Sequence, residues 1–208
     1  MLFRSKIRGA GGILIEGRTS LIGAFNLDNL LMAVAIAYMS GIDPIEISTN
    51  LSKYRGAPGR FEKVEVGQKF TAFVDYAHTP DAVNRVLAEA RKLTNGSVIA
   101  VLGCGGDRDR SKRPLMGDAL VAGSDIAIFT SDNPRSEDPI EILKQMSGEH
   151  KGEVIVDRKM AIERAVALAK PGDVVAVLGK GHETGQEIQG KKFSFDDGVI
   201  LANAIAGN

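Results

Sequence analysis

The sequence has little cysteine, no long apolar run and no net charge, and each of these absences excludes a class of protein. Its single cysteine, Cys104, excludes a disulfide within the chain and fits a reducing compartment. The longest apolar stretch, residues 30–39, is too short to span a bilayer, and no signal peptide opens the chain. Lys plus Arg and Asp plus Glu each number 26, so the net charge of zero gives no overall attraction to nucleic acid or to an anionic membrane. We therefore expect a cytoplasmic protein that binds neither nucleic acid nor membrane.

The common metal and phosphate motifs are incomplete. A zinc helix of the form H-E-x-x-H would need histidine at Gln186, and the dinucleotide motif G-x-G-x-x-G would need glycine at Arg108. A P-loop around Lys180 would need glycine at Val174 and Ser or Thr at Gly181. The 208 residues therefore hold no complete cradle for a nucleoside triphosphate, and we predict no metal site in them.

From about residue 58 the chain alternates between short apolar runs and helical patterns. The runs are rich in Val and Ile, as expected of parallel strands covered on both faces; they occupy 69–75, 97–103, 125–130, 153–157 and 173–179. Helices are predicted over 80–93, 113–123, 138–146, 157–170 and 196–206, with Asp138 and Asp157 as N-caps. This order predicts an α/β fold, a doubly wound Rossmann-like and mostly parallel sheet.

The first 57 residues have a different pattern. A short strand over 11–16 and one apolar helix around 27–40 are too few to enclose a core. We therefore divide the chain into residues 1–57, the end of another domain, and residues 58–208, a domain of their own. The boundary lies in the glycine- and proline-rich segment 55–60. Residues 1–57 are expected to be mobile or to pack on the second domain.

The loops that follow four of the predicted strands are charged. In a sheet of this kind ligands bind beyond the carboxyl ends of the strands, and here those segments are 75–81, 103–113, 131–139 and 179–186. The glycine-rich segment 103–106 offers backbone N–H groups near cations, which suits a carboxylate or a phosphate; the cations are Arg108, Arg110, Lys112 and Arg113. The alternative is a solvated loop with internal Asp–Arg pairs among residues 107–110.

The turn over 130–139 is predicted to be stiff. Pro134 fixes its own φ and restricts Asn133 to extended geometry, so Arg135 and Asp132 are held in a fixed relation. An arginine fork matches a carboxylate, whereas Asp132 or Glu183 can accept hydrogen bonds from an ammonium. The combination suits a zwitterionic amino acid.

Plain structural roles are the alternatives for these residues. Arg135 could pair locally with Glu137 or Asp138 in an Asn-Pro turn, and exposed pairs of that kind contribute only ~0–1 kcal/mol. His78 could be a turn histidine before the following helix, and Asp75 could cap a strand end.

Five segments, in this order and spacing, resemble the Mur ligases, most closely the members that add meso-diaminopimelate. They are "FNLDN" (25–29), "VDYAHTPDAV" (74–83), "GCGGDRDRSKRPLMG" (103–117), "TSDNPRSEDP" (130–139) and "GKGHE" (179–183). The likeness runs from about Gly23 to near the end of the chain. Residues 2–5, "LFRS", have no counterpart in it, and we interpret them as a product of cloning or sequencing.

The resemblance implies an ATP-dependent ligase of peptidoglycan synthesis. In that family ATP, with Mg²⁺, phosphorylates the γ-carboxylate of D-glutamate in UDP-N-acetylmuramoyl-L-alanyl-D-glutamate, and the amine of diaminopimelate attacks the acyl phosphate. An N-terminal UDP-binding domain, a central P-loop domain and a C-terminal amino-acid domain share the work. This chain resembles the end of the central domain plus the C-terminal domain. It contains no positions for the family's P-loop lysine or metal ligands, so we expect no catalytic residue in it and no activity from it alone.

The resemblance also implies roles for individual residues. Diaminopimelate would be held by Arg108, Asp132, Asn133, Pro134, Arg135, Gly179 and Glu183. Arg135 would bind the carboxylate of the distal stereocentre, and lysine-adding members lack that arginine. The nucleotide would lie near Asn26 and Asn29 at the adenine, and near Arg60, Asp75, Tyr76 and His78 once the domains close.

Three other functions stay open at this point. The chain could be a free-standing module that captures a zwitterion or an anion without chemistry. It could belong to a lysine-adding ligase. It could also belong to a ligase similar to folylpolyglutamate synthetase, but this last hypothesis accounts poorly for the segments "DNPR" and "GKGHE".

Overall fold

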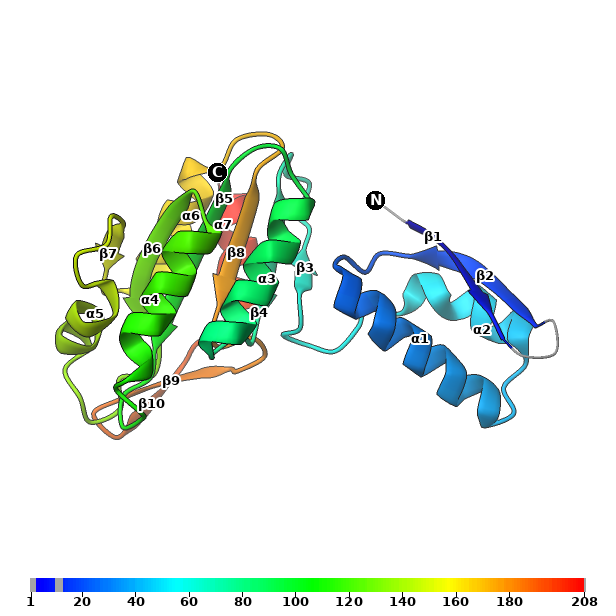
Figure 1. Cartoon of the computed structure of the whole chain (residues 1–208), viewed down its shortest axis with the longest axis horizontal. Coiled ribbons are helices and arrows are strands. Elements are labelled where there is room, and N and C mark those ends of the chain that lie inside the picture. Colours follow the sequence, from blue (N-terminus) through cyan, green and yellow to red (C-terminus); the bar gives the residue numbers. More distant parts are fainter. Residues whose placement is uncertain (1–2, 10–12, 208) are drawn as a thin grey trace. The chain divides into compact units, whose positions relative to one another are not determined.

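The computed structural model describes residues 3–9 and 13–207 and divides the chain into two compact units, residues 1–58 and 59–208 (Figure 1). Each unit has its own secondary structure and its own buried residues. None of the helices in the described part of the chain has the length and apolarity needed to cross a bilayer.

The first unit is a β-hairpin with two helices. Strand β1 (Phe3–Arg8) pairs antiparallel with β2 (Leu14–Thr19), and the helices α1 (Ala24–Met39) and α2 (Pro44–Asn50) follow, with a 3₁₀ turn over Leu51–Lys53. Residues 3–5, which had no place in the sequence pattern, are thus part of a paired strand. The strand predicted over 11–16 begins at residue 14 instead, and residues 11 and 12 lie outside the described part.

The expectation that residues 1–57 have no core is wrong. The hairpin and α1 bury a small apolar cluster together with α2 and the 3₁₀ turn; its buried members are Ile15, Leu21, Leu30, Val34, Ile47 and Leu51. Sequence reading missed α2 because its short segment "PIEISTN" contains two isoleucines and a threonine, which favour strands. Its start is nevertheless well defined, since Pro44 occupies the first turn and the Asp43 side chain accepts a hydrogen bond from the Ile45 N–H.

The second unit is built on a six-stranded sheet in the order β3-β4-β8-β5-β6-β7. Its parallel strands are β4 (Thr71–Asp75), β8 (Val174–Leu178), β5 (Val98–Cys104), β6 (Ile126–Ser131) and β7 (Glu153–Ile155). The predicted parallel α/β sheet is therefore confirmed. The antiparallel edge strand β3 (Glu62–Val64) was missed because three half-exposed residues give too short a pattern to recognise.

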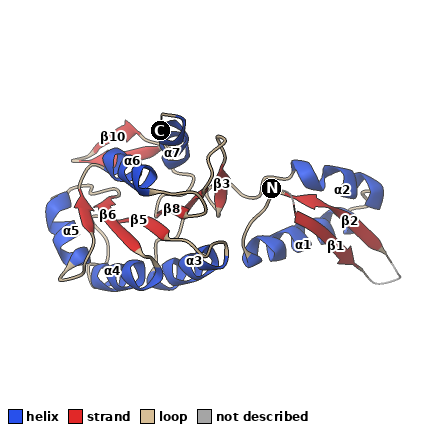
Figure 2. Cartoon of the chain, turned by 90° about the horizontal axis from the view of Figure 1, so that it is seen from above, coloured by secondary structure: helices blue, strands red, loops and turns tan. Residues whose placement is uncertain are grey.

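Helices cover both faces of this sheet. Figure 2 shows α3 (Pro80–Lys92) and α4 (Lys112–Gly123) on one face, and α6 (Arg158–Leu168) and α7 (Asp197–Ala206) on the other. Helix α5 (Pro139–Ser147) packs beside α4. The predicted N-caps are confirmed, because the side chains of Asp138 and Asp157 accept hydrogen bonds from the N–H groups of Ile140 and Met160.

The sheet interior explains why its strands are continuously apolar. All seven residues of β5 and all five of β8 are buried, as parallel strands covered on both faces require. Beyond the carboxyl end of β8 the chain forms an unpredicted hairpin, β9 (Gly185–Ile188) with β10 (Lys191–Ser194). Its turn has Gln189 and Gly190 at positive φ, the geometry of a two-residue hairpin loop.

Candidate functional site

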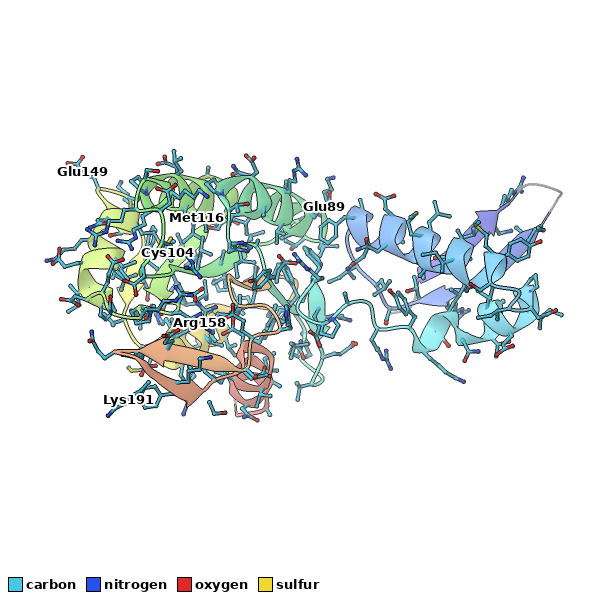
Figure 3. All side chains as sticks on the ribbon, turned by 90° about the horizontal axis from the view of Figure 1, so that it is seen from below. Glu89, Cys104, Met116, Glu149, Arg158 and Lys191 are labelled. Carbon is cyan, nitrogen blue, oxygen red and sulfur yellow. The ribbon has the colours of Figure 1, made fainter. Side chains whose placement is uncertain are left out.

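The carboxyl ends of β4, β5, β6 and β8 surround one pocket of about 420 Å³. Its wall contains eight of the residues to which the resemblance gives a role: Arg108, Asp132, Asn133, Arg135, Gly179, Glu183, Tyr76 and His78. Lys112 and Arg113, named above as cations near the glycine-rich segment, line it as well. Figure 3 labels Cys104, which also lines this pocket, and Arg158, which lies inside the same unit. Four loops far apart in sequence thus meet because parallel strands present their carboxyl ends at one edge.

The turn after β6 is fixed by the β9–β10 hairpin. The backbone N–H of Arg135 donates to the Glu187 carbonyl at 3.0 Å, and the Gln189 N–H donates to the Arg135 carbonyl at 2.6 Å. The buried Gln186 amide donates to the Asp132 carbonyl at 2.7 Å. Arg135 has a φ of +49°, which is uncommon for a residue with a Cβ and persists only where the surroundings impose it.

The Arg135 guanidinium lies in the pocket wall, and two of its three nitrogens contact neighbouring residues. Its Nη1 donates to the carbonyls of Gly106 at 2.7 Å and Asn133 at 3.5 Å, and its Nε lies 3.6 Å from Glu187 Oε2. Within the part of the chain that the structure describes, both guanidinium hydrogen bonds come from Nη1. Among the described residues Nη2 makes no hydrogen bond, so this nitrogen can donate to a carboxylate.

The local pairing considered as an alternative for Arg135 is not what the structure contains. Glu137 accepts hydrogen bonds from Arg113 at 2.8 and 3.1 Å and forms an ion pair with Arg110 at 3.0 Å. Asp138 is occupied as the cap of α5. Arg135 is thereby left facing the pocket.

The acidic half of the pocket is a hydrogen-bonded group. Asn133 Nδ2 donates to Glu183 Oε2 at 2.9 Å, and the fully buried Lys180 donates to Asn133 Oδ1 at 2.9 Å and to Glu183 Oε2 at 3.2 Å. Burial raises the pKa of Glu183, but the hydrogen bond from Asn133 and the charge of Lys180 outweigh it, so the pKa lies below the usual range. Burial raises the pKa of Asp132, although Arg158 and Lys180 oppose that rise.

The loop after β5 does not contain the internal Asp–Arg pairs considered as an alternative. Instead, Asp107 accepts from the Ser136 hydroxyl at 2.6 Å and Asp109 accepts from Ser111 at 2.6 Å. Arg108 is exposed in the pocket wall and can meet a ligand.

Arg113, counted with the ligand-binding cations, is a structural residue. It is buried, and it donates to Glu137, to Gln145 Oε1 at 2.7 Å and to the Gly105 carbonyl at 3.3 Å. Its hydrogen bonds lower the pKa of Glu137 to about 2. The Arg113–Glu137 pair therefore supports the loop rather than a ligand.

The residues expected near a nucleotide do not form one cluster in the structure. Tyr76 has the His78 ring at 4.7 Å and the Arg60 guanidinium carbon at 5.2 Å from its own ring centre. Asp75 is buried away from the pocket wall, and the backbone N–H groups of Phe61 and Ala77 each donate to it at 2.7 Å.

Asn26 and Asn29 belong to the first unit. Asn26 is buried and donates to the Ile22 carbonyl, and Asn29 donates to Asn26 at 3.4 Å.

Pro134, which was expected to contact the amino acid, is buried and does not line the pocket. Its carbonyl oxygen lies so close to Gly106 that a Cβ on residue 106 would be 1.9 Å from it.

Sequence reasoning missed a buried ion pair beneath the pocket. Arg158 donates to both carboxylate oxygens of Asp197, at 2.8 and 2.6 Å, and both side chains are fully buried. The same guanidinium donates to the carbonyls of Ser131 at 3.3 Å and Leu178 at 2.9 Å. It thus joins the carboxyl ends of β6 and β8. Only the Asp157-Arg158 helix start was visible in the sequence.

The fold and the pocket define an α/β domain with a polar pocket at the carboxyl edge of its sheet. Residues 59–181 match the family model described as the Mur ligase, glutamate ligase domain. The chain belongs to the Mur ligase family.

Known relatives are similar over nearly the whole chain. An Aquifex aeolicus protein named UDP-N-acetylmuramoyl-L-alanyl-D-glutamate--2,6-diaminopimelate ligase is 47% identical over 216 residues, which cover 99% of this chain and 44% of that protein. A solved structure of a ligase with the same name has a TM-score of 0.72 at 38% identity, covering 99% of this chain and 45% of that one. The E. coli FolC protein in complex with ADP has a TM-score of 0.59 at 25% identity, covering 82% and 39%. The chain thus spans less than half the length of these proteins.

Proposed function

We propose that the chain is part of an ATP-dependent ligase that adds meso-diaminopimelate to UDP-N-acetylmuramoyl-L-alanyl-D-glutamate, and that its pocket binds the diaminopimelate. The observation that supports this most is the shared wall of one pocket, in which cationic and anionic side chains face the same space; they are Arg108, Arg135, Asp132 and Glu183. Two relatives that are 47% and 38% identical to this chain are named as 2,6-diaminopimelate ligases, which supports the same substrate.

The charge distribution suits an amino acid with two zwitterionic ends. Nη2 of Arg135 would donate to a carboxylate, with Arg108 as a second cation, and Glu183 with Asp132 would accept from an ammonium. Lysine lacks the distal carboxylate and would leave Arg135 unmatched. Leaving a charged group without its partner costs ~1–3 kcal/mol, roughly a 5- to 150-fold preference.

We propose that the nucleotide is handled mainly by a part of the ligase that is not in this sequence. ATP supplies the phosphoryl group that activates the acceptor carboxylate, and a P-loop and Mg²⁺ ligands would come from that other part. The face of the Tyr76 ring beside Arg60 and His78 offers the stacking surface and the cation that a nucleotide needs. Asp75 would act indirectly, by holding the backbone at Phe61, next to Arg60, and at Ala77, next to Tyr76.

The two-unit organisation fits a division of labour within such a ligase. Residues 1–57 would be the end of an ATP-binding domain that carries Asn26 and Asn29 toward the adenine, and residues 58–208 would deliver the amino acid. The reducing, ATP-rich cytoplasm would be the site of reaction, in keeping with a single buried Cys104.

Calorimetric titration of the 208-residue chain with meso-diaminopimelate and with L-lysine tests the proposal. The wild type should bind diaminopimelate more tightly. Arg135→Ala should weaken that binding by at least about tenfold and remove the preference, since one charged contact is worth about this much. Arg85→Ala, which removes an exposed arginine of α3 outside the pocket wall, is the matched control.

Other results would contradict the proposal in distinguishable ways. Equal or tighter binding of lysine would favour a lysine-adding ligase, and a preference for glutamate would favour a folylpolyglutamate-type enzyme. Retention of the preference by Arg135→Ala would refute the role of that residue. If neither amino acid binds, the same comparison is made as diaminopimelate-dependent ADP release by the full-length ligase, and absence of release there refutes the function itself.

A further inference from the structure

We propose that Lys180 is a positioning residue of the pocket: its buried ammonium keeps the acidic side chains that receive the ligand's ammonium ionised and in place. The inference rests on the proposed function, because it assumes that the pocket binds an amino acid. Lys180 does not line the pocket, so it acts through Asn133, Glu183 and Asp132.

Lys180 is buried completely and faces three side-chain oxygens. Its Nζ donates to Asn133 Oδ1 at 2.9 Å and to Glu183 Oε2 at 3.2 Å, and it lies 3.7 Å from Asp132 Oδ1. Among the residues that the structure describes, it is the one that forms ion-pair contacts with both carboxylates. A lysine has three donors, and a buried one is tolerated only where such acceptors compensate its lost hydration.

The contact with Lys180 also determines the orientation of the Asn133 amide. Oδ1 accepts from both Lys180 Nζ and the Glu187 N–H at 3.0 Å, so this end of the amide is the oxygen. The amide nitrogen consequently points to Glu183 Oε2. Lys180 therefore helps to fix both the donor and the acceptor that the pocket presents at this wall.

The flanking glycines explain how the lysine turns inward. Gly179 and Gly181 have φ values of +110° and +53°. A Cβ on Gly179 would lie 2.9 Å from Asp132 Oδ2, and one on Gly181 would lie 2.7 Å from the Tyr76 Cβ. Only a backbone without side chains at these two positions can approach the neighbouring loops closely enough to direct Lys180 into the interior.

Removing the ammonium would leave two carboxylates facing a common space. The charged groups that act on them electrostatically include Arg158 of α6, Asp197 of α7 and Arg135 of the turn after β6, and Asp132 in turn acts on Cys104 of β5. Other titratable or charged residues that line the same pocket or contact Asn133 are Tyr76 and His78 after β4, Arg108, Asp109, Lys112 and Arg113 after β5, and Glu187 of β9. Arg158 is paired with Asp197, and Arg135 contacts the Gly106 carbonyl and the Glu187 carboxylate. Without Lys180 we expect the pKa values of Asp132 and Glu183 to rise, so that the pair takes up a proton at a higher pH than in the wild type.

The binding test compares pH profiles rather than single affinities. Calorimetric titration with meso-diaminopimelate is done between about pH 5.5 and 8 on the wild type, Lys180→Met and Lys180→Arg. Lys159→Met, which removes an exposed lysine of α6, is the control. The affinity of Lys180→Met should fall about tenfold per pH unit below the pKa of the shared proton, and this fall should begin at a higher pH than in the wild type and the Lys159→Met control. A Lys180→Met profile parallel to that of the wild type would overturn the inference, because a purely structural loss does not depend on pH in this way.

An unfolding test decides the electrostatic part even if the wild-type chain binds no diaminopimelate, because it needs no ligand. In the wild type the pKa of Glu183 is below its usual value, so its stabilising effect is present above that usual value and is lost as pH falls. The urea midpoint of Lys180→Met should therefore lie well below that of the wild type at pH 7, and the gap should shrink by at least half at about pH 4.5.

An equal gap at both pH values would contradict the inference. If Lys180→Met does not fold at pH 7, the triple variant that also carries Asp132→Asn and Glu183→Gln should fold, because it has no unpaired carboxylates. A triple variant that is unfolded as well would overturn the inference.

Discussion

Breaking the buried ion pair between Arg158 and Asp197 should destabilise the second unit strongly. Both side chains are fully buried, and the guanidinium also donates to the carbonyls of Ser131 and Leu178. In Arg158→Met the Asp197 carboxylate loses both of its hydrogen bonds at 2.8 and 2.6 Å without gaining water. Removing one partner of a buried pair costs about 3–5 kcal/mol, and for a protein of this size about 2–4 °C of melting temperature accompanies each kcal/mol. We expect a decrease of roughly 6–20 °C.

The assay should report on the second unit alone, because the chain has two compact units. Amide hydrogen exchange of β5, β6 and β8 provides such a probe, since exchange from central strands measures global opening of their own unit. Circular dichroism during heating gives the melting temperature.

A double-mutant cycle separates the cost of leaving one buried charge unpaired from the cost of removing the whole ion pair. Arg158→Met combined with Asp197→Leu should be more stable than either single variant, since no buried charge is left unpaired. The control is Arg164→Met, which breaks the exposed pair with Glu153 at 2.8 Å and should cost no more than about 1 kcal/mol. The reasoning is refuted if Arg158→Met melts within about 2 °C of the wild type, or if the double variant is the least stable of the three.

Two titrating groups give further predictions. Hydrogen bonds from Arg113 lower the pKa of Glu137 from 4.5 to about 2, so Glu137 stabilises the fold above pH 4.5 and this contribution is lost as pH falls toward 2; an NMR titration of its carboxyl with a midpoint near 4.5 would disprove the contact. Burial, with the charge of Asp132, raises the pKa of the Cys104 thiol to about 12, which leaves about one thiolate in ten thousand at pH 8. Iodoacetamide should therefore modify Cys104 at least about a hundredfold more slowly in the folded chain than in denaturant, and equal rates would contradict its burial.

Most of the second unit follows from local patterns. Runs such as 97–103 and 173–179 are apolar because both faces of a parallel strand are covered, and Asp138 and Asp157 show where helices begin. Alternation of strand and helix then places the carboxyl ends of the strands at one edge, which is why the loops that contain Arg108, Asp132, Arg135 and Glu183 could be named together before any coordinates. Short or irregular elements failed this reasoning: β3, α2 and the β9–β10 hairpin have too few residues to display a period.

The roles of the buried charges depended on the tertiary structure. Lys180 and Asn133 are 47 residues apart, Arg158 and Asp197 are 39 apart, and Arg113 and Glu137 are 24 apart. Nothing in the local pattern around any of these residues indicates a partner at such a distance, and in sequence a buried arginine or lysine looks like an exposed one. Composition and spacing determined which chemical groups reach the edge of the sheet. Only the packing of distant segments decided which of those groups face the pocket and which hold it in shape, because desolvation makes a buried charge dependent on the partner that the fold brings to it.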